Sequence, residues 1–356
     1  ADKSYDRFSA RVFERTLGFK PAPAKAQWEI TYRCNLHCVH CYTDPYNQTD
    51  RIRQELPFDK LIALMGEMAE AGVLWVTLTG GEAVAHPRFR DIYRAAKERG
   101  FIVTLLSNAT LLSDDLVEFL AADPPFQLDV SVHGATKPVF DRVAGVAGAH
   151  DRFSAGLRRA LDRGLPVRLK SNAMTINRGE LNALQTFVEG LGLDFNLYTT
   201  LYPRLDGDLS GTAYRLSPEE IVDLELGEAI SRDCAIAPDS ATESHPLPPE
   251  NLFRCGCGGN SFTIDPYGML RPCTFTTSPA FDLKRLPLVE AFDRMVETVR
   301  AARYESDSAC RTCAAYRDCD KNPAMAAHEA GSQEAPVPHF CAVAFGRMAR
   351  GETRAV

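Results

Sequence analysis

Short apolar, β-branched runs alternate with longer amphipathic runs through residues 27–201 of the chain. The short runs predict β-strands, because a few residues of this composition between turn signals are typical of a strand. These strands are expected at Gln27–Arg33, Val73–Thr79, Phe101–Ser107, Gln127–Val132, Val167–Ala173 and Phe195–Leu201.

Stretches with helical spacing lie between these strands. In "FDKLIALMGEMAEAG", the residues Leu61, Leu64, Met65 and Met68 fall on one face, and Gly72 is placed to end the helix. The same plan recurs in "HPRFRDIYRAAKERG", "AHDRFSAGLRRALDRG" and "NRGELNALQTFVEGLG". The alternation predicts an α/β fold with a parallel sheet, either a partial (β/α)6 TIM-like barrel or an open doubly wound sheet. In both folds the active site lies at the carboxyl ends of the strands.

Beyond residue 215 the alternation fades. "LSPEEIVDLELGEAI" predicts one more helix with Ser217 as its N-cap, and the Pro/Ser-rich "APDSATESHPLPPEN" predicts a linker or loop. "SFTIDPYGMLRPCTF" predicts a β-hairpin. We therefore expect an N-terminal extension at 1–24, the barrel at 25–215, a linker and helix at 216–252, and a small cysteine-rich α+β domain at 253–356.

Composition narrows the class of protein. Of the 356 residues 45% are hydrophobic, which is enough for a sizeable core, and the net charge of −7 with no basic run argues against nucleic acid as a partner. No apolar run approaches the roughly 20 residues of a membrane span, and the first residues contain no apolar signal region. We expect a cytoplasmic protein that binds neither nucleic acid nor membrane.

Eleven cysteines are unusual for such a chain. The number is odd and no export signal is visible, so metal or redox ligands are favoured over disulfides. Three of them, Cys34, Cys38 and Cys41, lie in one short stretch, and the other eight lie between Cys234 and Cys341. This distribution predicts two chemical centres on two regions of the chain.

Polar and glycine residues collect at the predicted strand ends. The three-cysteine stretch follows the first strand and "TGGEA" ends the second, while polar residues end the third and fourth. Beyond the cysteines, these strand-end residues are Gly80, Gly81, Glu82, Ser107, Asn108, Ser131, His133 and Gly134. Since the carboxyl ends of parallel strands meet at one edge, we expect these residues to line one pocket.

The spacing C-x3-C-x2-C offers three thiolates on one tight loop. A structural zinc ion wants four ligands, whereas a cubane iron–sulfur cluster held by three cysteines leaves one iron open to a substrate or cofactor. This triplet after the first strand, with Gly-Gly-Glu after the second, resembles the radical SAM superfamily. The resemblance implies that S-adenosylmethionine (SAM) binds the open iron of a [4Fe–4S] cluster and yields a 5′-deoxyadenosyl radical. Structural zinc is the alternative.

The resemblance also assigns roles to residues. Cys34, Cys38 and Cys41 are the cluster ligands, and His40 takes the position whose backbone lies near the adenine. Gly80, Gly81 and Glu82 receive the SAM amino group, while Ser107, Asn108 and Ser131 lie where the family contacts the ribose or carboxylate. Arg142 is either a partner of the SAM carboxylate or a surface residue. His133 stands where the family often has Asp, so it is either catalytic or a satisfied polar residue.

The cysteines of the tail resemble the SPASM extension of radical SAM enzymes, which holds two auxiliary [4Fe–4S] clusters. Two segments carry this resemblance, "CGCGGNSFTIDPYGMLRPC" and "CRTCAAYRDC". It implies one cluster on Cys310, Cys313, Cys319 and Cys341. A zinc ribbon is the alternative, because Cys310 and Cys313 have the spacing of a zinc knuckle.

The other auxiliary cluster departs from the family pattern. It retains Cys255, Cys257 and Cys273, but Pro323 stands where the family has its fourth cysteine. Either Cys234 replaces that ligand, or one iron is open to a substrate group. If Cys234 is not a ligand, it either donates a hydrogen atom in the radical reaction or is a thiol without a role.

Most SPASM proteins act on peptides or proteins, so we expect hydrogen abstraction from a ribosomally made precursor peptide, giving a crosslinked or otherwise oxidised side chain. Sulfatase maturation is less favoured, because Thr274 stands where those enzymes carry an Asp that acts as the catalytic base. Asp129 shares a strand face with Ser131 and is a candidate base, with a buried structural carboxylate as the alternative. The catalytic candidates are Asp129, His133 and Cys234.

The partners follow from the same resemblance. Only 33 residues precede Cys34, which is short for a leader-binding domain, so we expect leader recognition by a separate leader-binding protein or by the barrel surface. A flavodoxin- or ferredoxin-type protein is the expected reductant. The alternatives are a dehydrogenase or epimerase that acts on a small molecule or a peptide α-carbon, and a metal-binding scaffold without catalysis.

Overall fold

The computed structural model describes residues 21–43, 49–226, 250–254 and 258–350. One nine-stranded sheet runs through it in the order β6–β5–β4–β3–β2–β1–β7–β8–β9. The strands are β1 (Lys25–Thr31), β2 (Trp75–Gly80), β3 (Ile102–Ser107), β4 (Gln127–Ser131), β5 (Val167–Asn172), β6 (Asp194–Tyr198), β7 (Ser261–Ile264), β8 (Met269–Arg271) and β9 (Phe281–Asp282). Strands β1 to β6 pair in parallel, as the sequence predicts.

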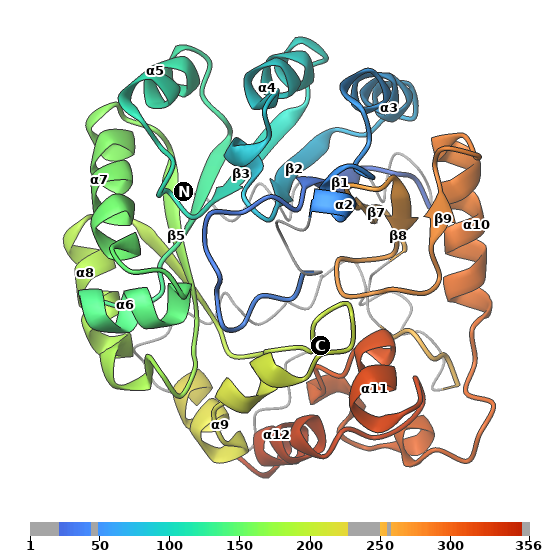
Figure 1. Ribbon diagram of the computed structural model, residues 1–356. Helices are drawn as coiled ribbons and strands as arrows, with labels where there is room; N and C mark the ends of the chain where they lie inside the picture. Colours follow the sequence, from blue (N-terminus) through green and yellow to red (C-terminus); the bar gives the residue numbers. More distant parts are fainter. Residues whose placement is uncertain (1–20, 44–48, 227–249, 255–257, 351–356) are drawn as a thin grey trace.

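Helices cover the outer face of this curved sheet (Figure 1). They are α3 (Phe58–Glu70), α4 (Phe89–Glu98), α5 (Asp114–Ala122), α7 (Ala149–Asp162) and α8 (Leu181–Gly190). Shorter elements are α2 (Thr49–Ile52), α6 (Lys137–Ala144) and the 3-10 turns η1 (Ala83–Ala85), η2 (Arg178–Glu180), η3 (Ser210–Tyr214), η5 (Ala309–Thr312) and η6 (Tyr316–Asp318). Because these five helices lie on one face only, the fold is a partial barrel, and the doubly wound alternative is wrong.

The two faces of the sheet differ in polarity. Alternate residues such as Trp28, Ile30 and Val103 are fully buried in the core that the sheet shares with the outer helices. Their neighbours along the strands, such as Gln27 and Thr77, point to the concave face and are only partly buried. The inside of the partial barrel is therefore lined by polar side chains.

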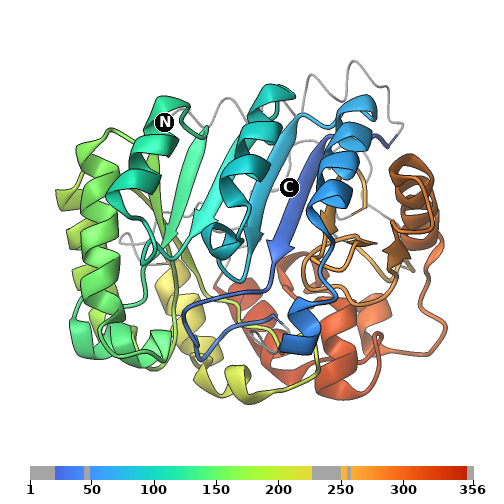
Figure 2. The same ribbon diagram turned by 45° about the horizontal axis from the view of Figure 1, so that its top comes forward.

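The tail continues the barrel sheet. Strand β7 pairs in parallel with β1 and turns into β8 as an antiparallel hairpin, which confirms the predicted hairpin. Helices α10 (Leu288–Ala301), α11 (Pro323–Ala330) and α12 (Pro338–Ala349) follow, and α12 packs on α9 (Pro218–Leu226) (Figure 2). The small domain expected from the sequence is thus joined to the barrel by main-chain hydrogen bonds between two strands.

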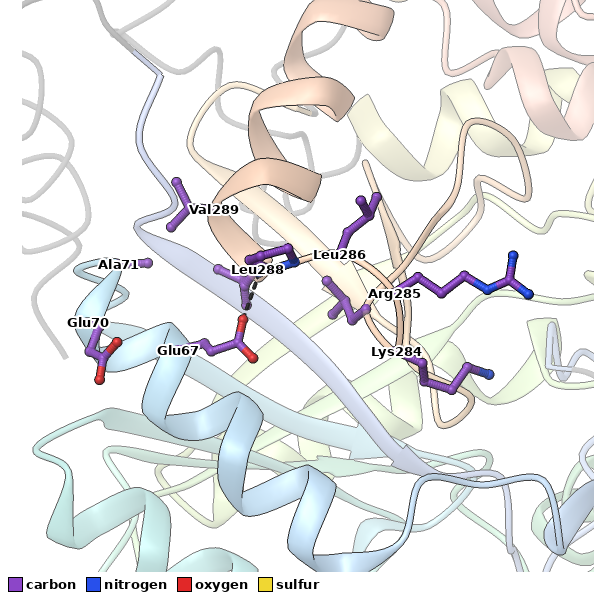
Figure 3. A pocket seen from close by; sticks show the side chains of 10 residues that line it. Glu67, Glu70, Ala71, Lys284, Arg285, Leu286, Leu288 and Val289 are labelled. Atoms are coloured by element: carbon purple, nitrogen blue, oxygen red, sulfur yellow. Dashed lines mark hydrogen bonds between the residues drawn. The ribbon is translucent and has the colours of Figure 1, made fainter.

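Two further side-chain interactions connect the tail to earlier parts of the chain. Glu67 on α3 accepts a 2.7 Å hydrogen bond from the backbone N–H of Leu288, which caps α10 beside an open surface pocket of about 560 Å³ (Figure 3). The buried Arg347 of α12 binds Glu225 of α9 and Asp320. These contacts join residues that lie far apart in the sequence.

Most predicted element ends lie within two residues of the observed ones. Ser217 is the N-cap of α9, with a capping box in which the Ser217 hydroxyl accepts from the Glu220 N–H and the Glu220 carboxylate accepts from the Ser217 N–H. The sixth strand ends at Tyr198, three residues before the predicted Leu201, because the Thr199 side chain turns to Glu225 of α9. In the described part of the chain, no helix combines the length and apolar character that a bilayer crossing requires.

Candidate active site

The three-cysteine loop leaves the carboxyl end of β1 and docks on α6. The backbone N–H groups of His37 and Val39 donate to the carbonyls of Ala144 and Val143 at 2.9 and 3.0 Å. Gly145 permits this close approach, because its φ is 67° and a Cβ there would lie 2.3 Å from the His37 carbonyl oxygen. The backbone of the loop is therefore fixed by the barrel.

Each thiol of this loop has a polar side chain beside it. The Asn108 Nδ2 lies 3.9 Å from the Cys34 sulfur, and the His133 Nε2 lies 3.7 Å from the Cys38 sulfur. The Thr43 hydroxyl lies 3.1 Å from the Cys41 sulfur. These three neighbours come from three different segments of the barrel.

Burial controls the protonation of these thiols. It raises the pKa of Cys34 to about 12 and also raises the pKa of Cys38 and Cys41. Buried thiols of this kind keep their protons unless a metal replaces them, because metal ligation requires the thiolate. Three such thiols on one loop fit an iron–sulfur cluster.

No three His, Cys, Asp or Glu side chains of the described residues converge closely enough to hold one metal ion. A single zinc ion requires that convergence, whereas a cubane binds each thiolate to a different iron and holds its cysteines farther apart.

Glu82 is buried at the end of β2. Its carboxylate accepts hydrogen bonds from the Ser107 hydroxyl at 2.9 Å and the Asn108 backbone N–H at 2.7 Å. Burial raises its pKa to about 7, partly offset by these hydrogen bonds. The segment that follows β1 requires a glycine at position 81, because a Cβ there would lie 2.6 Å from the Arg33 carbonyl oxygen. The structure therefore brings the predicted Glu82, Ser107 and Asn108 together.

The other residues that the sequence analysis assigned to the cofactor or to catalysis differ in exposure. Ser131 ends β4 on the concave face and is partly buried. His40 and His133 lie ring to ring at 5.3 Å, and burial lowers their pKa values to about 4 and about 3. Both imidazoles are therefore neutral. Arg142 is exposed on α6.

Asp129 is held in an ion-pair network inside the barrel. Arg168 donates to both of its oxygens at 2.8 and 2.9 Å, and Lys170 forms a third contact. Side chains on β5 supply both cations, because Asp129 pairs in register with Arg168. The geometry matches the alternative given above for Asp129, a buried structural carboxylate.

Glu29 was missed by the sequence analysis. It is fully buried on the concave face of β1, and its two oxygens accept 2.8 Å hydrogen bonds from the hydroxyls of Tyr32 and Tyr42. Burial raises its pKa to about 7, and the tyrosine hydrogen bonds lower it in part. The signal was present, since Glu29 is the one acidic residue within the apolar run that forms β1.

The tail cysteines of the second expected cluster come from η5, η6 and α12. The pKa of Cys341 is raised by burial and by the charges of Cys310 and Cys313, and that of Cys319 is raised to about 11, chiefly by burial with a part from Cys310 and Cys341. These electrostatic effects couple Cys341 with Cys310, Cys313 and Cys319.

The first expected auxiliary site is described only at Cys273, since Cys234, Cys255 and Cys257 lie outside the described residues. The Thr276 hydroxyl and the Asn322 Nδ2 lie 3.0 and 3.6 Å from the Cys273 sulfur. Asn322 also caps α11, so Pro323 is the first residue of that helix.

Comparisons with known proteins agree with this arrangement. Residues 28–186 match the model of the Radical SAM superfamily. The chain is 25% identical over 320 residues to the AdoMet-dependent heme synthase of Methanosarcina barkeri, covering 84% of this chain and 90% of that protein. It is 31% identical over 173 residues to the PqqA peptide cyclase of Rhodopseudomonas palustris, covering 48% of this chain and 45% of the cyclase, less than half of its length.

Solved structures share the fold. Streptococcus suis SuiB bound to precursor peptide SuiA aligns with a TM-score of 0.60 and 16% identity, covering 84% of this chain and 72% of that one. SuiB bound to S-adenosylmethionine aligns equally well, with a TM-score of 0.60 and 15% identity over 84% and 71% of the two chains. The chain therefore carries a radical SAM domain at residues 28–186, and this part of it belongs to the Radical SAM superfamily.

Proposed function

We propose that this protein is a SAM-dependent radical enzyme that oxidises a residue of a ribosomally made peptide, giving a crosslinked or otherwise oxidised side chain. One observation carries the proposal: three partly buried cysteines on a fixed loop lie next to the strand ends that hold Glu82, Ser107 and Asn108. The family implies a [4Fe–4S] cluster with SAM at such a loop.

The chain's own residues supply binding and orientation. Cys34, Cys38 and Cys41 would hold the cluster, and Glu82 would accept a hydrogen bond from the SAM ammonium group, which favours its charged form. When bound, the cluster and SAM supply the radical that abstracts hydrogen from the substrate. Glu29 is the proposed proton acceptor, since its pKa near 7 lets it take up a proton at neutral pH.

Similar proteins support a peptide substrate. The names of the PqqA peptide cyclase and of SuiB bound to its precursor peptide specify peptides. The polar, partly buried concave face of the sheet suits a peptide, because its main chain needs hydrogen-bonding partners. A separate leader-binding protein and a flavodoxin- or ferredoxin-type reductant complete the proposal.

The tail is proposed to hold two auxiliary clusters. Cys310, Cys313, Cys319 and Cys341 would bind one of them, and Cys273 contributes to the other together with Cys255 and Cys257. These clusters would accept the electron that the substrate releases after hydrogen abstraction. The fourth position of the first auxiliary cluster is proposed to be Cys234 or a substrate group.

A second candidate function is oxidation of a small molecule. The match to the heme synthase of Methanosarcina barkeri favours it, because that match spans most of both chains and the name of that protein specifies a small-molecule product. The two candidates make opposite predictions about the need for a peptide.

The test uses anaerobically reconstituted protein with dithionite and SAM. We expect 5′-deoxyadenosine from the native protein and none from Cys38→Ala, whereas a metal-binding scaffold forms none in either. If a short open reading frame lies beside the gene, co-expression with the peptide that it encodes should remove hydrogen from that peptide, seen as a loss of mass. Turnover of a small molecule without any peptide would favour the second candidate.

A further inference from the structure

His133 follows β4 and points its imidazole at the cluster loop. Its side chain is buried, with 5% of the residue exposed, and its Nε2 lies 3.7 Å from the Cys38 sulfur. Its Nδ1 is buried and has no hydrogen-bond partner among the described residues. Within the described part of the chain, the one polar contact of the ring is therefore directed at a thiol that we propose as a cluster ligand.

The surrounding structure fixes this ring. The fully buried Asn177 donates a 3.1 Å hydrogen bond to the His133 carbonyl oxygen and holds the backbone. The rings of Phe140 and His40 pack against the imidazole at centroid distances of 5.2 and 5.3 Å. Such packing leaves little room for another orientation.

The chemistry of an iron-bound sulfur selects one tautomer. A ligating thiolate has no proton and can only accept a hydrogen bond. If Nδ1 carried the ring proton, a buried N–H would lack a partner and the lone pair of Nε2 would face the sulfur. Both features are costly, so the proton belongs on Nε2.

We propose that His133 donates an Nε2–H hydrogen bond to the Cys38 thiolate and thereby raises the reduction potential of the SAM cluster. Reduction adds negative charge to the cluster and its sulfurs, so a donor stabilises the reduced form more than the oxidised form. An ionised carboxylate at this position could only accept a hydrogen bond and could not donate one. His133 is thus a positioning residue for the cluster, and it is not the base of the reaction.

The inference rests on the proposed cluster at Cys34, Cys38 and Cys41. The experiment is a redox titration of the reconstituted full-length protein, followed by electron paramagnetic resonance of the reduced SAM cluster. His133→Phe removes the donor, and His133→Gln retains an N–H group near the same place. His150→Phe is the matched control, because His150 packs on the other side of Phe140 at 5.6 Å.

We expect His133→Phe to lower the midpoint potential while iron and sulfide per chain stay unchanged. At the native midpoint, its ratio of reduced to oxidised SAM cluster should fall roughly three- to tenfold, the net worth of one ordinary hydrogen bond. His133→Gln should restore most of the native potential, and His150→Phe should not change it. An unchanged potential in a fully loaded His133→Phe protein would overturn the inference and leave the proposed function intact.

A second measurement covers the case in which His133→Phe fails to assemble. Native protein labelled with 15N-histidine should show a nitrogen coupling to the reduced SAM cluster, and this coupling should vanish in His133→Gln. Its absence in loaded native protein would contradict the inference. Absence of iron from the triplet itself would instead overturn the proposed function and the inference with it.

Discussion

The two cysteine groups of this protein are positioned by different means. The triplet Cys34, Cys38 and Cys41 lies on one loop whose backbone is hydrogen-bonded to α6. The tail group Cys310, Cys313, Cys319 and Cys341 is spread over two 3-10 turns and α12, with exposed residues between its members. The triplet therefore lies on one loop that the barrel fixes, whereas the tail group requires several separate segments to come together. We therefore expect the proposed metal centre of the tail to stabilise its segments in addition to accepting an electron, and the centre of the barrel to be dispensable for folding.

We expect the largest effect when the three cysteines of the barrel loop are removed: SAM cleavage is lost while the protein stays folded. The variant Cys34→Ala/Cys38→Ala/Cys41→Ala should produce no 5′-deoxyadenosine, because no other group of the loop can hold a cluster. Its thermal unfolding, followed by circular dichroism, should remain cooperative, because the loop backbone is held by α6. A variant that is unfolded at room temperature would remove the contrast between the two groups.

The tail should behave in the opposite way. Cys310→Ser/Cys313→Ser should raise the rate of proteolytic cleavage between residues 303 and 322 roughly tenfold, because loss of two proposed ligands would release a segment that consists mainly of loops and short 3-10 turns. Thr312→Ser, between the two cysteines, is the control and should be cleaved at the native rate. Equal cleavage of the double variant and the native protein would show that the tail needs no metal.

In the barrel, the raised pKa of Glu29 predicts that the stability of the protein depends on pH. Its folded-state pKa of about 7 exceeds the ordinary value of 4.5, so the folded protein binds its proton more tightly than the unfolded chain. Stability should therefore fall as the pH rises from 4.5 to about 7, by about 3 kcal/mol in total. Glu29→Gln should flatten this part of the pH profile in urea unfolding of the cluster-free protein. A profile identical to that of the native protein would argue against a neutral Glu29.

We expect a smaller effect from Glu82, whose protonation or substitution should weaken the binding of SAM. Its pKa of about 7 predicts that affinity for SAM falls as the pH drops below 7, because the protonated carboxyl no longer attracts the ammonium group. Glu82→Gln should weaken SAM binding about tenfold at about pH 8, the worth of one charge-assisted hydrogen bond, and should lose the pH dependence. Equilibrium dialysis with labelled SAM measures both, and a pH dependence that persists in Glu82→Gln would assign it to another group.

The smallest effect concerns the fastening of the tail to the barrel. Glu67→Ala removes the carboxylate that caps α10 and should cost about 1 kcal/mol of unfolding free energy. Glu67→Gln keeps an acceptor and should cost less. Denaturant unfolding compares the two variants, and equal losses would mean that the charge of Glu67 matters rather than its hydrogen bond.

Much of the fold was predictable from the chain. The apolar runs located all six barrel strands, and the residues at strand ends located Glu82, Ser107 and Asn108. What escaped prediction depends on contacts between distant segments. The pairing of β7 with β1 joins residues more than 230 positions apart, for example Lys25 with Ser261, and no local pattern encodes it.

The roles of single polar residues were harder to predict than the fold. Asp129 and Glu29 both lie on strands and face the concave side, and only their partners distinguish them. Asp129 is bound by Arg168 and Lys170, whereas Glu29 accepts hydrogen bonds from two tyrosines. These partners become visible only when neighbouring strands and loops are placed in space.

The most direct test of the account counts iron, sulfide and zinc per chain after anaerobic reconstitution. The native protein is compared with the variant Cys34→Ala/Cys38→Ala/Cys41→Ala. The account predicts about 12 irons falling to about 8, because each of three cubanes contributes four. About 4 irons falling to none, with zinc retained, would make the tail a zinc module and contradict the proposed pair of auxiliary clusters.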